Sequence, residues 1–161
     1  KLAIYSTFQK FWTRHKLHTS LIVSCYSPEL KTNNFILLHQ INVVAASVNS
    51  ALPHVECSRG IKILPDLPLE EALKKGPYDI LVLPGGLKGA ETFAKDENVG
   101  KLLQQYESEG RKVAAICAAP TALKQHGVFK AAKLTSYPAF KEELSAGGYP
   151  YSDKNVVVSG E

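Results

Sequence analysis

The chain has 161 residues, of which 45% are hydrophobic and 21% are charged, and its formal net charge is +4. This composition predicts one globular domain with a hydrophobic core, and it excludes a disordered or collagen-like chain. No apolar run is long enough for a membrane-spanning helix, and three cysteines in this length do not make a disulfide framework. We therefore expect a reducing compartment and no membrane partner.

The positive charge is concentrated near the amino terminus. Residues 1–50 contain five basic residues and one acidic residue, Glu29, whereas residues 51–161 contain 14 of each sign. Glycine is also absent before Gly60. This break in composition indicates two stretches of different character. Residues 1–40 match no regular element and are predicted to be an irregular extension; a transit peptide and a nucleic-acid-binding arm are the alternatives, and nucleic acid is not expected as a partner.

From residue 41 onward, the patterns of strands and helices alternate. Short apolar runs rich in β-branched residues predict buried strands, and segments with an early proline or a closing glycine predict helices. The predicted strands are 41–46, 79–83, 112–116 and 155–158, and 55–63 is predicted to be an extended stretch with a turn around 58–60. The predicted helices are 69–75, 89–95, 99–109, 118–127 and 136–144. Such alternation predicts βαβ units, and hence a parallel sheet covered by helices on both faces.

Two loops at predicted strand ends are candidate functional sites, because sites in such sheets form beyond the carboxyl ends of the strands. One is Pro84-Gly85-Gly86, and the other is the abrupt step from strand to helix at Cys117. The second has the pattern of a nucleophile elbow, and a thiol at the start of a helix lies in positive potential that favours the thiolate. The amides of Gly85 or Gly86 and of Ala118 would then stabilise an oxyanion.

Each of these loops also has a structural alternative. Cys117 is equally explained as a buried structural cysteine, and Gly85-Gly86 as a tight turn. The glycine run lacks the spacing of a nucleotide-binding loop, and no Cys-x-x-Cys, His-x-x-x-His or acidic cluster has the spacing of metal ligands. We therefore expect neither a cofactor nor a metal.

Three segments together carry a family resemblance: VLPGG at 82–86, AAICAAPTAL at 114–123 and VECSRG at 55–60. They resemble the DJ-1/PfpI superfamily, above all its eukaryotic, parkinsonism-associated deglycase branch. The resemblance covers residues 41–161, which we interpret as the family domain. It implies a flavodoxin-like three-layer α/β sandwich with a mostly parallel sheet and a nucleophile elbow, and it implies a homodimer.

The resemblance also implies a function centred on Cys117, which in the family is both the nucleophile and a redox-sensing thiol. The implied chemistry needs no cofactor: a glyoxalase converts methylglyoxal to lactate, and a deglycase acts on early glycation adducts. A non-enzymatic redox sensor or chaperone-like protein and an inactive fragment are the alternatives. Cys57 matches a family cysteine near the subunit interface and is predicted to be a secondary redox thiol, or else a partly buried neutral one. The implied location is cytoplasmic, with nuclear and mitochondrial pools.

The chain departs from the family pattern in three places. Residues 1–40 show no first strand, so Glu29 is not assigned as the family's acid/base glutamate, and an enzyme of this kind would be impaired. Tyr137 stands where many members have a histidine, and we predict that its phenol donates a hydrogen bond. The chain stops at Glu161, without the family's C-terminal helix. Together with the absence of Met, these departures indicate a fragment or a processed product.

Overall fold

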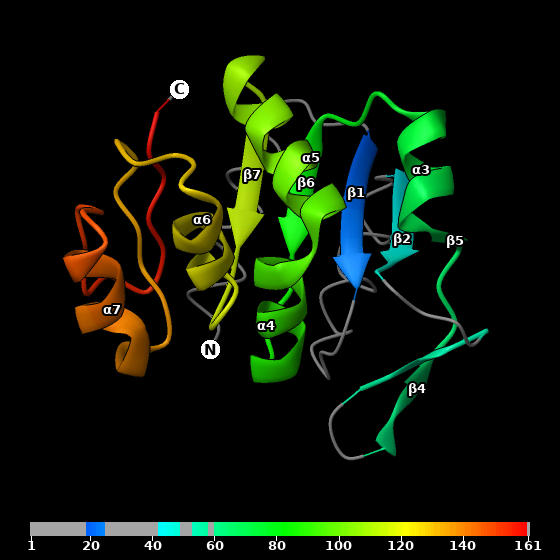
Figure 1. The fold of residues 1–161 in the computed structure, drawn as a ribbon, viewed down its shortest axis with the longest axis horizontal. Coiled ribbons are helices and arrows are strands. Elements are labelled where there is room, and N and C mark those ends of the chain that lie inside the picture. Colours follow the sequence, from blue (N-terminus) through cyan, green and yellow to red (C-terminus); the bar gives the residue numbers. More distant parts are fainter. Residues whose placement is uncertain (1–18, 25–41, 49–52, 58–59, 161) are drawn as a thin grey trace.

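The computed structural model describes residues 19–24 (backbone only), 42–48, 53–57 and 60–160. They form a five-stranded sheet of order β5-β2-β1-β6-β7 (Figure 1). The strands are β1 (Thr19–Ser24), β2 (Asn42–Ser47), β5 (Leu67–Pro68), β6 (Ile80–Leu83) and β7 (Lys112–Ala115). All neighbouring pairs are parallel, and the order of the four longer strands is that of flavodoxin-like folds. The predicted fold class is thereby confirmed.

Strand β1 lies in the middle of the sheet, between β2 and β6. Leu21 pairs with Val44 on one side and with Leu81 on the other. The prediction that the domain lacks its first strand, and that residues 1–40 contain no regular element, is therefore wrong at Thr19–Ser24. Only three apolar residues stand between polar ends in this segment, a pattern too short to identify a strand until its neighbours supply hydrogen bonds. The rest of the predicted extension lies outside the described residues.

Helices α3, α4 and α5 lie in front of the sheet in Figure 1, and α6 packs against α4 and α5. Their bounds are α3 (Leu69–Lys75), α4 (Leu87–Lys95), α5 (Glu97–Ser108) and α6 (Pro120–His126), close to the predicted ranges. The fully buried residues Phe93, Leu103 and Tyr106 form one core with Leu81 and Leu83 of β6. Burial of each such side chain contributes about 1.5–3 kcal/mol, so the helices are fixed on the sheet mainly by their apolar faces. The prediction that helices also cover the opposite face of the sheet stays a prediction.

The C-terminal third differs most from its predicted elements. The predicted helix 136–144 is divided into a 3₁₀ turn, η2 (Pro138–Phe140), and a helix, α7 (Lys141–Ala146). The predicted strand 155–158 is wrong, because no strand is formed there. A valine run becomes a strand only with a hydrogen-bonded neighbour, and these residues pair with no strand in the part of the chain that the structure describes. Leu134 and Tyr151 instead form an isolated parallel bridge.

A small hairpin stands apart from the main sheet. It consists of β3 (Val55–Glu56) and β4 (Lys62–Ile63), which pair antiparallel and both lie within the predicted extended stretch 55–63. Across the described ranges, no helix has the length and apolar character needed to cross a membrane.

Candidate active site

The two predicted site loops leave the sheet side by side, because β6 and β7 are parallel neighbours. Leu83 pairs with Ala115, and the N–H of Ile116 donates a 3.3 Å hydrogen bond to the carbonyl of Leu83. Immediately beyond, a Cβ atom added to Gly85 would lie 2.7 Å from the Cβ of Cys117 and 3.6 Å from its Sγ. Glycine at position 85 therefore lets the thiol approach the backbone of the neighbouring loop.

Cys117 has a strained backbone conformation. Its φ is +62°, in the left-handed region that residues with a side chain rarely adopt. Such a residue costs about 1–3 kcal/mol and persists only where its surroundings impose it. The strand ends at Ala115 and α6 begins at Pro120, so Cys117 stands in a tight turn between them. This is the geometry of a nucleophile elbow, and it leaves the thiol partly exposed.

Three backbone amides belong to this turn or to the loop beside it. Gly85 is buried, and Gly86 has a φ of +103° and starts α4, its carbonyl accepting a 2.9 Å hydrogen bond from Ala90. Within the described ranges, the N–H groups of Gly85, Gly86 and Ala118 donate to no protein acceptor. A ligand oxygen beside Cys117 would find donors here, although the oxyanion role of these amides stays a prediction.

Tyr137 reaches the elbow through its backbone. Its N–H donates a 2.9 Å hydrogen bond to the carbonyl oxygen of Cys117. The residue is 56% exposed, and its ring meets the ring of Phe140 edge to face, with 6.3 Å between the centroids. The predicted hydrogen bond from the phenol stays a prediction, because the structure shows only the backbone contact.

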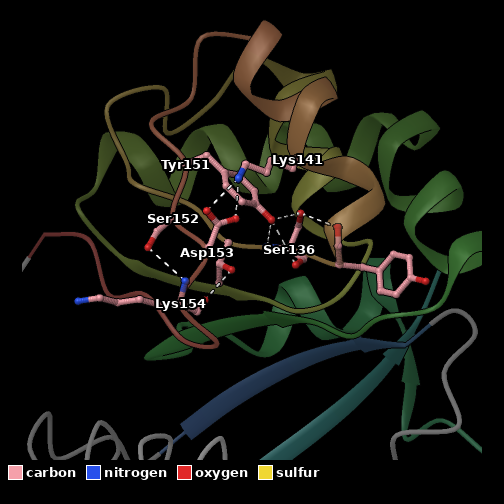
Figure 2. A network of polar contacts seen from close by, with 8 residues as sticks. Ser136, Lys141, Tyr151, Ser152, Asp153 and Lys154 are labelled. Atoms are coloured by element: carbon pink, nitrogen blue, oxygen red, sulfur yellow. Dashed lines mark hydrogen bonds and ion pairs between the residues drawn. The ribbon is translucent and has the colours of Figure 1, made fainter.

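Sequence reasoning missed the polar network that surrounds this segment. Figure 2 shows Ser136 and Tyr151 pointing toward one another, with Lys141 and Asp153 joined beside them. The Ser136 Oγ and the Tyr151 Oη lie 3.1 Å apart. No periodic pattern relates two residues so far apart in the chain. The one available signal was the density of hydroxyl groups in TSY at 135–137 and YSD at 151–153.

Cys57 differs from Cys117 in its exposure. It follows β3, the residue is 1% exposed, and its backbone N–H donates a 2.6 Å hydrogen bond to the carbonyl of Ile61. A buried thiol is hard for an oxidant to reach, so the predicted redox role of Cys57 gains no support from its position. Glu29 lies outside the described residues. Among those described, no three His, Cys, Asp or Glu residues form a group able to hold a metal ion.

Comparison with known proteins identifies this arrangement. The sequence model of the DJ-1/PfpI family matches residues 30–161. The chain belongs to the DJ-1/PfpI family. Its match to the family therefore begins within the stretch 1–40, and the predicted resemblance to the family and its eukaryotic branch is confirmed.

Curated members of the DJ-1/PfpI family are similar over most of this chain. Protein DJ-1alpha of Drosophila melanogaster is 45% identical over 121 residues, which are 75% of this chain and 55% of the relative. The Glutathione-independent glyoxalase DJR-1.2 of Caenorhabditis elegans is 37% identical over 110 residues, 68% of this chain and 58% of the relative. The chain thus spans little more than half the length of these relatives.

A solved structure of the DJ-1/PfpI family shows the same fold. The crystal structure of Drosophila melanogaster DJ-1beta superposes with a TM-score of 0.81 at 36% sequence identity. The superposition covers 89% of this chain and 78% of that one. The shared fold includes the parallel sheet at whose carboxyl edge Cys117 stands.

Proposed function

We propose that this chain performs cysteine-dependent, cofactor-free chemistry on small reactive carbonyl compounds, with Cys117 as the nucleophile. Methylglyoxal and early glycation adducts are the proposed substrates. The observation that carries the proposal is the strained, partly exposed Cys117 beside Gly85 at the carboxyl edge of the sheet. The name of the Caenorhabditis elegans relative, a glutathione-independent glyoxalase, supports the glyoxalase form of the proposal.

The chemistry follows from the groups around the elbow. The thiolate of Cys117 adds to the aldehyde carbon of methylglyoxal and forms a hemithioacetal, whose oxyanion would accept hydrogen bonds from the amides of Gly85 or Gly86 and of Ala118. A proton then moves from the former aldehyde carbon to the neighbouring carbonyl carbon, and water releases lactate from the resulting thioester. One carbon is oxidised while its neighbour is reduced, so the reaction consumes one water and needs no external oxidant.

The proton transfer requires an acid/base group, and we propose Glu29 for this role. In the family, as the sequence resemblance implies, the corresponding glutamate follows the first strand. In this chain β1 (Thr19–Ser24) is such a strand, and it ends five residues before Glu29. The carboxyl end of β1 lies beside β6, which leads to Gly85. A carboxylate is a suitable group for general acid/base catalysis of this step.

The test is lactate production from methylglyoxal by the chain and by its Cys117→Ala variant. We expect turnover in the first and loss of turnover in the second. Cys57→Ser is the matched control, because Cys57 is the other cysteine that the structure describes and it is buried. Equal turnover in the chain and in Cys117→Ala would refute the enzymatic proposal.

A second candidate function, redox sensing by Cys117, is favoured by the contrast between the two described thiols. Cys117 is partly exposed, whereas Cys57 is 1% exposed, and oxidation is selective for accessible thiols. Mild peroxide should therefore oxidise Cys117 before Cys57, with the sulfinate as the stable product. Peptide mass spectrometry would measure this order, and oxidation of both at one rate would contradict sensing at Cys117.

Homodimer formation and a cytoplasmic location with nuclear and mitochondrial pools remain proposals drawn from the family resemblance. Sedimentation of the purified chain would measure the oligomeric state, and a monomer at all concentrations would contradict the first proposal. Imaging of the tagged chain in cells would test the second.

A further inference from the structure

The backbone conformation of Cys117 is stabilised by a residue that lies outside the turn in which Cys117 stands. Its φ of +62° is maintained only if neighbouring groups impose it. One such group is the N–H of Tyr137, which donates a 2.9 Å hydrogen bond to the carbonyl oxygen of Cys117. The position of the Ser136–Tyr137 backbone therefore bears directly on the orientation of the peptide that follows the thiol.

The hydroxyl of Tyr151 in turn contacts Ser136, the residue before Tyr137, and Figure 2 shows the two side chains pointing toward one another. The N–H of Ser136 donates to the Tyr151 Oη at 3.2 Å, and the Ser136 Oγ lies 3.1 Å from the same oxygen. The Ser136 hydroxyl donates onward to the carbonyl of Tyr137 at 3.0 Å. The Tyr151 hydroxyl thus accepts from the Ser136 amide, and its own proton has two acceptors within reach, the Ser136 hydroxyl at 3.1 Å and the Ser136 carbonyl at 3.4 Å.

Two contacts hold Tyr151 itself, and an ion pair fixes the second of them. It forms a parallel bridge with Leu134, two residues before Ser136. The Nζ of Lys141 lies 5.7 Å from the centroid of its ring, an arrangement that permits a cation–π contact. The same Nζ binds both carboxylate oxygens of Asp153 at 2.8 Å. The phenol is thus presented to Ser136 by a C-terminal segment distant in sequence from the elbow.

We infer that Tyr151 is a positioning residue for Cys117, acting through Ser136 and the backbone N–H of Tyr137. The inference rests on the proposed function, in which Cys117 is the reacting nucleophile. Loss of the phenolic hydroxyl leaves the Ser136 amide without its acceptor and frees the Tyr137 backbone to move. The elbow then relaxes toward ordinary backbone angles, and the thiol is less well presented.

The test measures the rate at which iodoacetamide alkylates Cys117, followed by peptide mass spectrometry so that each cysteine is counted separately. We expect Tyr151→Phe to lower this rate about fivefold, the equivalent of one hydrogen bond of about 1 kcal/mol. Ser136→Ala removes the two hydroxyl contacts of the same network, to Tyr151 and to the carbonyl of Tyr137, while keeping the backbone bond to Tyr151, and it should lower the rate too. Ser136→Thr keeps the hydroxyl and should restore it.

Tyr149→Phe is the matched control, because Tyr149 lies in the same segment and its hydroxyl also donates to backbone oxygens. Those acceptors are Val128, at 2.6 Å, and Leu123, at 2.9 Å, and neither belongs to the chain of contacts that leads to Cys117. We expect this variant to melt at a lower temperature while Cys117 keeps its alkylation rate. A merely structural role for Tyr151 would make the two tyrosine variants behave alike.

The outcomes separate this inference from the proposed function when lactate formation is measured on the same preparations. Slower alkylation in Tyr151→Phe supports the positioning role even if the unaltered chain makes no lactate, a result that would refute only the proposed function. Unchanged or faster alkylation in both Tyr151→Phe and Ser136→Ala overturns the positioning role even if lactate is made. If Tyr151→Phe shows no cooperative melting, the rate in Ser136→Ala decides.

Discussion

Gly85 and Cys117 approach so closely that a Cβ atom on Gly85 would lie 2.7 Å from the Cβ of Cys117. The backbone sets the position of each Cβ, so neither atom can move aside by rotation of a side chain. The contact explains why the loop after β6 carries glycine at this point, and it joins the two strand ends into one site.

Gly85→Ala is therefore expected to destabilise the fold and to slow the chemistry of Cys117. Overpacking of this kind costs about 1–3 kcal/mol, because the two loops must separate to admit the methyl group. Urea unfolding would measure the loss of stability, and alkylation of Cys117 the loss of reactivity. Gly76→Ala is the control, since a Cβ there meets the Tyr78 ring at an ordinary 3.5 Å. Equal stability of Gly85→Ala and Gly76→Ala would contradict the prediction.

Glu29→Gln is expected to lower the turnover of methylglyoxal while the fold is kept. General acid/base catalysis contributes about 10²–10⁴-fold, so we expect a loss of at least about a hundredfold in kcat. Lactate assays together with thermal melting would separate loss of function from loss of structure. Glu70→Gln, at an exposed position on α3, should keep full activity. Wild-type turnover in Glu29→Gln would remove Glu29 from the mechanism.

Asp96→Ala is expected to destabilise the fold through the start of α5. Asp96 is 8% exposed, and its Oδ1 accepts a 2.9 Å hydrogen bond from the N–H of Val99. Loss of an N-cap acceptor costs about 0.5–2 kcal/mol. Asp96→Asn keeps an acceptor at the same place and should lose less. The midpoint of urea unfolding would rank the two variants, and an equal loss in both would argue against the cap.

Stability is expected to fall at alkaline pH because of three buried phenols. Burial raises the pKa of Tyr78, Tyr106 and Tyr149 above the ordinary value of 10.0. The folded state holds these phenol protons more tightly than the unfolded state does. The contribution of the three protonated phenols to the free energy of unfolding is therefore fully present below about pH 10, and it is lost as the pH rises through the folded pKa values.

The urea midpoint measured from about pH 8 to pH 11 checks this expectation. The hydroxyl of Tyr149 donates a 2.6 Å hydrogen bond to the carbonyl of Val128, a contact that ionisation would abolish. Tyr149→Phe should therefore weaken the dependence on pH as well as lower the stability at neutral pH. A midpoint that stays constant up to about pH 11 would contradict the prediction.

The sequence by itself determined the strands β6 and β7, the helices that follow them and the candidate elbow at Cys117. These elements are local: a continuous apolar run makes a buried strand, and proline or glycine limits a helix within a few residues. The glycine pair at 85–86 and the family resemblance are also visible in the sequence, because each rests on short runs of neighbouring residues.

Only the tertiary structure decided which segments pair across the molecule. The segment Thr19–Ser24 became a central strand because β2 and β6 lie on either side of it, whereas the valine run at 155–158 found no described strand to pair with. The contact between Gly85 and Cys117 and the support of the elbow by Tyr151 join residues distant in the chain. Such contacts depend on how the elements pack, and a local pattern of residues does not predict that packing.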